Sequence, residues 1–205
     1  MSNRPTPDTS SLEERIEEFL SCMTIEEKVG QLNQVPATSK NTVEVRDLAR
    51  RGMVGSRILA SSAWAGNEAQ QTADQEEGNE VQRVAVEESR LGIPIINGRD
   101  VIHGHRTIFP INIGQAASWN PVLVEEAAHI AATEARPLGV HWTFAPMVDV
   151  ARDPRWGRIV EGAGEDPWLN AVMAAAQVRG YQGDDPSAPD RMLACAKHFA
   201  AYGGA

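Results

Sequence analysis

The chain has 205 residues and carries 28 Asp and Glu against 19 Lys and Arg, a formal net charge of −9. This acidic balance argues against a nucleic-acid or anionic-membrane partner, because such partners are bound by clustered positive charge. The length allows one large domain with its own core, and no apolar run approaches the ~20 residues that cross a bilayer.

The first ten residues are polar and rich in Pro, Ser and Thr, which predicts a disordered tail over 1–10 and a folded domain over 11–205. Because this tail lacks the apolar run of a secretory signal, we expect a cytoplasmic protein. The alternative is a periplasmic or secreted protein from which a signal peptide has been removed. Cys22 and Cys195 are the only cysteines, so no disulfide framework is expected.

Helical patterns dominate the first half of the chain. Apolar residues at helical spacing predict a helix over Leu12–Met23. The run Thr24-Ile-Glu-Glu27 is typical of a capping box, and we expect it to open a second helix with Val29 and Leu32 facing inward. The other elements expected here are helices over 42–51 and 67–91 and a buried strand over 54–60.

Strands and helices alternate in the second half. The expected strands are 93–97, 140–144 and 192–198, with a further candidate near Ile111–Ala117, and the expected helices are 120–136 and 168–182. Strand–helix–strand order with continuous apolar strands implies a parallel sheet covered by helices, the α/β class. A complete eight-stranded barrel takes ~250 residues. The sequence therefore predicts a (β/α) barrel truncated after four or five strands.

Polar, Gly-rich segments follow three of these strands, at 98–105, 146–158 and 197–204. In barrels and in open α/β sheets alike, ligands bind at the carboxyl ends of the strands. Lys197 and His198 close the last expected strand, where alternation would send their side chains to opposite faces. Both can reach one ligand only if the strand ends or the backbone bends at this point.

Asp100 lies in the first of these polar segments. Its carboxylate could accept hydrogen bonds from two neighbouring hydroxyls, which a monosaccharide supplies. It could equally cap a helix or pair with Arg99 or Arg106.

The segment Asp149-Val-Ala-Arg-Asp-Pro-Arg-Trp-Gly-Arg158 combines three arginines, two aspartates and a tryptophan. It could grip a polyhydroxylated or anionic ligand, or it could be a surface loop held by its own ion pairs. Carboxylates are also frequent in this region: Asp149, Asp153, Glu161, Glu165 and Asp166. Neighbouring arginines would lower their pKa values, so we assign none of them as a general acid or base.

A metal site is a further interpretation. His103, His105 and His198, with Asp149 or Asp153, could supply zinc ligands. Arg106 would place a positive charge beside the cation, so histidines that are structural or contact a substrate are favoured and no metal or cofactor is expected.

Five blocks of the chain, in order, carry a resemblance to a known family. They are 23–32, 100–110, 145–158, Gly164-Glu-Asp-Pro167 and Lys197-His-Phe-Ala-Ala-Tyr-Gly203. Together they closely resemble the N-terminal domain of glycoside hydrolase family 3, in particular its bacterial β-glucosidase and β-xylosidase branch. Gly162-Ala163-Gly164 departs from it where the family usually carries an aromatic residue.

The resemblance implies a TIM-like barrel domain and retaining hydrolysis of β-linked oligosaccharides or aryl and alkyl β-glycosides. It implies that Asp100, Arg158, Lys197 and His198 hold hydroxyls of the sugar in the −1 subsite, and Trp156 could wall this pocket. In the family, the nucleophile and the acid/base lie beyond the position that corresponds to Ala205. We therefore expect this chain alone to bind sugars weakly and not to hydrolyse them.

Two other functions stay open. One is a non-catalytic sugar-binding or assembly module that works with a complementary C-terminal portion or by self-association. The other is a metal-dependent hydrolase. A downstream strand end carrying the nucleophile would decide for a glycosidase.

Overall fold

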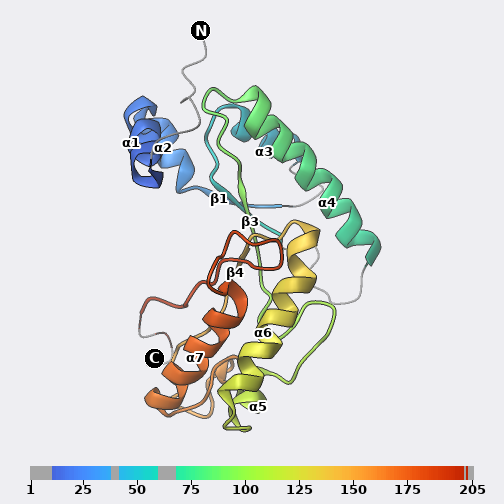
Figure 1. Cartoon of the computed structure of the whole chain (residues 1–205), viewed down its shortest axis with the longest axis vertical. Helices are drawn as coiled ribbons and strands as arrows, with labels where there is room; N and C mark the ends of the chain where they lie inside the picture. The colour runs from blue at the N-terminus through green and yellow to red at the C-terminus, as the bar shows by residue number, and fades with distance from the viewer. Residues whose placement is uncertain (1–10, 38–41, 60–67, 201, 203–205) are drawn as a thin grey trace. The chain divides into compact units, whose positions relative to one another are not determined.

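The structure is a computed structural model that describes residues 11–37, 42–59, 68–200 and 202. The expected tail over 1–10 lies outside these residues. The chain forms two compact units, one ending at Asn97 and one continuing from Gly98 (Figure 1). Among the described residues, no helix is both long enough and apolar enough to span a membrane.

Four α-helices belong to the first unit: α1 (Leu12–Cys22), α2 (Ile25–Gln31), α3 (Thr42–Arg50) and α4 (Glu68–Arg83), the last continued by a π-helical turn over Val84–Glu88. The expected capping box is confirmed, because the side chains of Thr24 and Glu27 each accept a hydrogen bond from the other's backbone N–H. Ser11 and Glu14 cap α1 in the same way.

The inward orientation predicted for Val29 and Leu32 is wrong, since both side chains are exposed. The buried residues of α2 are instead Glu27 and Gly30. Glu27 forms an ion pair with Arg90, and Gly30 lies so close to the backbone of Met53 that a Cβ would not fit. The buried face of α2 is therefore determined by an ion pair and a close backbone approach. The apolar residues of α2 do not define this face, although their spacing predicted that they would.

The core of the first unit lies between α3, α4 and the strands. Its buried members are Val45, Ala49, Val54, Val81, Val84, Ala85 and Ile95. Strand β1 (Gln34–Pro36), which was not predicted, pairs in parallel with β2 (Ser56–Ile58). The strand expected over 54–60 is shorter than predicted within the described residues.

Strand β3 (Ile96–Arg99) runs across the boundary at Asn97, and its last two residues pair in parallel with β4 (Trp142–Thr143) of the second unit, with Gly98 opposite Trp142 and Arg99 opposite Thr143. Gly98 lies against the ring of Phe144, where an added Cβ would overlap the ring atoms. The pairs β1–β2 and β3–β4 are both parallel, as the alternation of strands and helices predicts.

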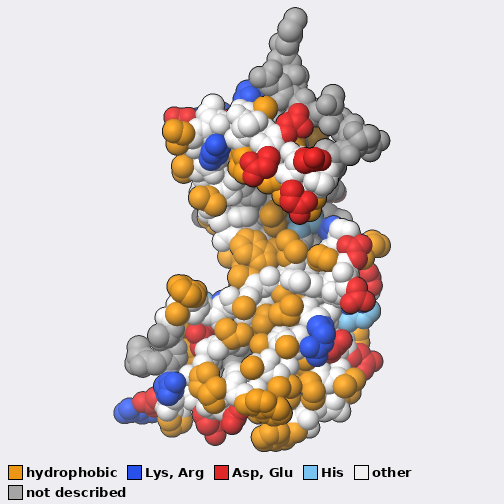
Figure 2. Space-filling model, turned by 60° about the vertical axis from the view of Figure 1, so that its left-hand side comes forward, with side chains coloured by type: hydrophobic (Ala, Val, Ile, Leu, Met, Phe, Trp, Pro, Cys, Tyr) orange, Lys and Arg blue, Asp and Glu red, His pale blue; other side chains and the backbone are white. Residues whose placement is uncertain are grey.

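Two long helices pack side by side in this unit, α6 (Pro121–Ala135) and α7 (Pro167–Gln182) (Figure 1). The Asn120 side chain accepts hydrogen bonds from the first backbone N–H groups of α6, and Asp166 does the same for α7. At Gly180 an added Cβ would lie 2.6 Å from Ala128 Cβ, so glycine permits the close approach of the helices. Large hydrophobic side chains also remain on the surface of this unit (Figure 2), and they include Trp119, Val122 and Trp168.

The strand candidate near Ile111–Ala117 is wrong, because this segment is the short helix α5 (Asn112–Ala116). The backbone N–H groups of Gln115 and Ala117 donate to carbonyl oxygens four residues earlier, at Ile111 and Ile113. The segment thus satisfies its own backbone without a neighbouring strand.

The strand expected over Met192–His198 is present only as an extended segment. It runs parallel to β4 and to the chain that follows β4, through two isolated bridges, Trp142 to Leu193 and Met147 to Lys197. Backbone hydrogen bonds join the two segments between the bridges, from Cys195 N–H to Ala145 O and from Lys197 N–H to Pro146 O. The pairing shifts by one residue between the two bridges, which breaks the regular ladder. The direction of the predicted strand is therefore confirmed, but its regular pairing is not.

Candidate functional site

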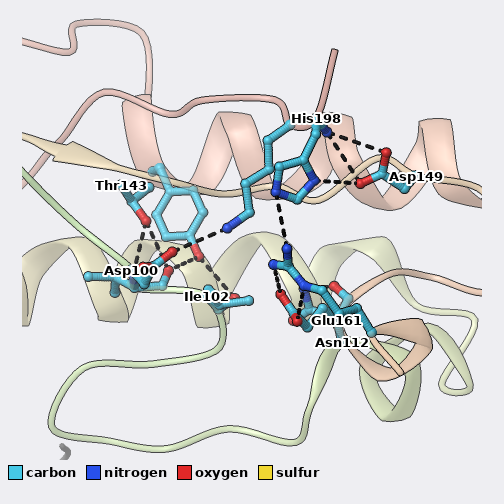
Figure 3. Close-up of polar contacts among 11 residues, drawn as sticks. Asp100, Ile102, Asn112, Thr143, Asp149, Glu161 and His198 are labelled. Atoms are coloured by element: carbon cyan, nitrogen blue, oxygen red, sulfur yellow. Dashed lines mark hydrogen bonds and ion pairs between the residues drawn. The ribbon is translucent and has the colours of Figure 1, made fainter. Parts of the chain in front are cut away.

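The polar segments that follow β3, β4 and the extended segment over 193–197 meet within the second unit. Figure 3 shows Asp100, Asp149, Glu161 and His198 in one region, joined by hydrogen bonds and ion pairs. These segments are far apart in the sequence, and the parallel arrangement brings the carboxyl ends of the strands together.

Asp100 comes directly after β3, and its partner is Lys197, whose Nζ lies 3.2 Å from Asp100 Oδ1. The Lys197 side chain is 14% exposed and the Asp100 side chain 49%, so the carboxylate is the more open group of the pair. Pairing with Lys197, rather than helix capping, is the contact that the structure gives Asp100.

The backbone beside Asp100 is held from two sides (Figure 3). Thr143 Oγ1 of β4 accepts from Val101 N–H at 3.2 Å, and the buried Tyr181 hydroxyl of α7 donates to Val101 O at 2.7 Å. Burial raises the pKa of Tyr181, so its hydroxyl keeps the proton that it donates. Thr143 and Tyr181 were not predicted from the sequence, because neither residue lies within a polar motif.

His198 is bound to Asp149 of the loop after β4. His198 Nδ1 lies 2.7 Å from Asp149 Oδ2, and the backbone N–H of His198 donates to the same carboxylate. Asp149 is almost fully buried, whereas His198 is about one-third exposed. Lys197 and His198 both place their side chains in this site, as the hypothesis of a strand ending there requires.

Arg158 forms a two-pronged ion pair with Glu161, with Nε to Oε1 and Nη2 to Oε2 both at 2.6 Å. This guanidinium lowers the pKa of Glu161. Arg158 Nη1 also lies 3.5 Å from His198 Nε2, which joins the two ion pairs into one chain of contacts. Asn112 of α5 donates to the Glu161 carbonyl at 2.6 Å and holds this turn in place.

Aromatic rings border this chain of contacts. The Tyr202 ring lies 4.8 Å from the His198 ring and 5.4 Å from Arg158 Cζ, and the Trp156 ring lies 5.5 Å from Tyr202. Trp156 therefore reaches the site through Tyr202. Tyr202 was not predicted as a site residue, although an aromatic side chain four residues after His198 is a readable signal.

The loop after β4 also contains a second pair, which faces solvent. Arg155 binds Asp153 with Nη2 to Oδ2 at 2.6 Å, and the Arg155 side chain is 89% exposed. Asp153 and Arg155 thus fit the interpretation of a surface loop held by its own ion pairs. Arg158 lies beside His198, and its grip on a ligand stays a prediction.

The residues considered for a metal do not converge. His103 Nδ1 is bound to the carbonyl oxygen of Phe109, and His105 is buried. Burial, with a smaller contribution from Arg99, lowers the pKa of His105 to about 4. Within the part of the chain that the structure describes, no three His, Cys, Asp or Glu residues are placed to hold a metal ion.

Fold and site define an α/β protein whose charged groups gather at the carboxyl ends of parallel strands. Residues 24–205 match the family described as "Glycosyl hydrolase family 3 N terminal domain", and the chain belongs to this family. The resemblance that the five sequence blocks carry is confirmed.

Named relatives agree with this assignment. The chain is 38% identical over 189 residues to a periplasmic β-glucosidase of Salmonella typhimurium, covering 92% of this chain and 23% of that protein. It is 33% identical to a lysosomal β-glucosidase of Dictyostelium discoideum and 32% identical to a putative β-xylosidase of Formosa agariphila, covering 26% and 27% of those proteins. The chain thus spans about a quarter of the length of these curated relatives.

Solved structures show the same fold. A β-glucosidase from Listeria innocua in complex with isofagomine matches with a TM-score of 0.78 and 38% identity, over 95% of this chain and 27% of that one. An exo-1,3/1,4-β-glucanase from a Pseudoalteromonas species matches with a TM-score of 0.80 and 32% identity, over 99% of this chain and 26% of that one.

Proposed function

We propose that the whole protein is a retaining, exo-acting β-glycosidase and that these 205 residues supply the sugar-binding part of its site. The observation that carries the proposal is the single cluster in which Asp100–Lys197 and Asp149–His198–Arg158–Glu161 meet, in a chain of glycosyl hydrolase family 3. The nucleophile and the acid/base are assigned to residues outside this chain.

The chemistry of the cluster suits a monosaccharide. The Asp100 carboxylate accepts hydrogen bonds, while Lys197 and Arg158 donate them, and each sugar hydroxyl can do both. Charge-assisted hydrogen bonds of this kind can strengthen as the ring distorts towards an oxocarbenium-like transition state. Trp156 and Tyr202 add apolar surface beside Arg158. We propose that these groups hold the sugar in the −1 subsite.

The substrate is a β-linked glycoside. Structures of the Listeria innocua enzyme with isofagomine and with glucose, and of its mutant with laminaribiose, support a glucoside. The β-xylosidase names among the relatives keep xylosides as the second candidate. For the compartment, the name of the Salmonella relative supports the periplasmic alternative over the cytoplasmic one.

Titration of the chain with glucose, followed by NMR, tests the proposal. We expect weak, saturable shifts at His198 and its neighbours and no release of p-nitrophenol from p-nitrophenyl β-glucoside. Absence of any saturable shift would contradict the sugar site. Hydrolysis by a preparation free of other enzymes would contradict the placement of the catalytic pair outside the chain.

Exposed apolar side chains on the second unit, such as Trp119 and Trp168, support a partner surface. We propose that a complementary C-terminal portion, or a second copy of the chain, covers part of it. Sedimentation at rising concentration tests self-association, and a monomer at all concentrations would leave the complementary portion as the partner to co-express.

A further inference from the structure

We infer that Asp149 is a positioning residue that fixes the tautomer of His198, so that Nε2 faces the site as a hydrogen-bond acceptor. The inference rests on the proposed function for the identity of the ligand, a sugar hydroxyl. The tautomer itself is a property of the chain without ligand and is testable separately.

The two groups that flank the His198 imidazole, the Asp149 carboxylate and the Arg158 guanidinium, determine which ring nitrogen holds the proton. An ionised carboxylate can only accept hydrogen bonds, and a guanidinium can only donate them. Asp149 Oδ2 lies 2.7 Å from Nδ1, so Nδ1 donates its proton there. Arg158 Nη1 lies 3.5 Å from Nε2, and between these two nitrogens only Arg158 has a proton to offer. Both neighbours thus favour the same form, a neutral ring protonated at Nδ1.

Asp149 is suited to hold this arrangement. Its side chain is 4% exposed, and it also accepts a hydrogen bond from the backbone N–H of His198. The ring and the backbone of one residue are therefore tied to one carboxylate (Figure 3). The Tyr202 ring, edge-on at 4.8 Å, borders the imidazole on another side.

A consequence follows for ligand recognition. A hydroxyl that binds Nε2 must donate its proton to it, and its oxygen then remains free to accept from Arg158 or Lys197. The site thereby selects a group that is donor and acceptor at once. A fluorine in place of that hydroxyl has no proton to donate and loses the contact to His198.

Long-range ¹H–¹⁵N NMR of the histidine rings in the sugar-free chain tests the inference, at a pH where the imidazole is neutral. The ring signals of His198 are assigned as those that disappear from the spectrum of the His198→Gln variant. We expect the Nδ1–H form in the wild type. In Asp149→Asn the amide oxygen accepts from the backbone N–H and the amide nitrogen donates to Nδ1, so we expect a shift to the Nε2–H form.

The matched control is Asp153→Asn, an aspartate of the same loop whose carboxylate binds Arg155 instead. It should leave the His198 spectrum unchanged. An Nε2–H form in the wild type, or an unchanged tautomer in a folded Asp149→Asn chain, would overturn the inference. Should Asp149→Asn fail to fold, the wild-type spectrum alone decides. None of these spectra involves a sugar, so failure here is distinct from failure of the proposed function.

Discussion

Two arginine–carboxylate pairs in the loop after β4 have the same chemistry and different surroundings. Arg155 and Asp153 are two residues apart and meet in solvent, with the arginine 89% exposed. Arg158 and Glu161 are three residues apart and lie within the site, with side chains 34% and 23% exposed. Of the two arginines, only Arg158 also lies against the His198 imidazole and the Tyr202 ring.

The difference in surroundings is the reason that we place Arg158, and not Arg155, in the proposed sugar site. An exposed pair contributes little, because water competes for both charges. A guanidinium oriented by a half-buried carboxylate keeps its remaining N–H groups directed at a ligand, and the surrounding low dielectric strengthens those contacts. The predictions below separate the two pairs.

The largest effect is expected from removing Arg158, the arginine beside His198. Arg158→Gln loses a charge-assisted donor and should weaken glucose binding about tenfold or more, which corresponds to ~1.4 kcal/mol or above. Arg155→Gln is the matched control and should bind glucose as the wild type does. NMR titrations measure the affinity of the two variants for glucose. An equal loss of affinity in both would show that Arg158 contributes no more to glucose binding than Arg155 does.

Removing each carboxylate should have a smaller effect, on stability. Glu161→Gln removes the negative charge and one of the two oxygens that accept from Arg158 at 2.6 Å, and should lower the free energy of unfolding by about 1 kcal/mol. Asp153→Asn breaks only a solvent-exposed pair. Urea unfolding of the two variants measures the difference, and a larger loss in Asp153→Asn would reverse our ranking of the pairs.

The smallest effect is on the pH dependence of stability. Arg158 holds the pKa of Glu161 below its unfolded value, so the pair stabilises the fold above the unfolded pKa. That contribution is lost as the pH falls below about 4.3 and through the folded pKa. Unfolding midpoints measured across this range should fall less steeply in Glu161→Gln than in the wild type. Parallel curves would mean that Glu161 titrates alike in both states.

Much of the fold could be predicted from local signals. Asn120-Pro121 starts α6 as expected, because a capping side chain and a proline in the first turn are read within a few residues. The helix expected over 168–182 is also present, and Asp166 and Pro167 start it in the same way. The helix α5 was missed, since a run of five residues fits a short strand or a helix turn equally well.

The residues proposed for the site could be named from the sequence, but their mutual contacts could not. Asp100, Arg158, Lys197 and His198 come from motifs at strand ends, and the structure brings them together. The roles of Asp149 and Glu161 depend on which arginine or histidine each carboxylate meets in three dimensions. The loop after β4 holds several arginines and several carboxylates, so their spacing in the sequence does not determine which side chains form ion pairs.

A crystal structure of the chain soaked with glucose tests the central claim most directly. The account predicts sugar hydroxyls within hydrogen-bond distance of Asp100, Arg158, Lys197 and His198, with one hydroxyl on His198 Nε2. Glucose bound beside Arg155, or elsewhere on the chain with these four side chains unoccupied, would contradict it.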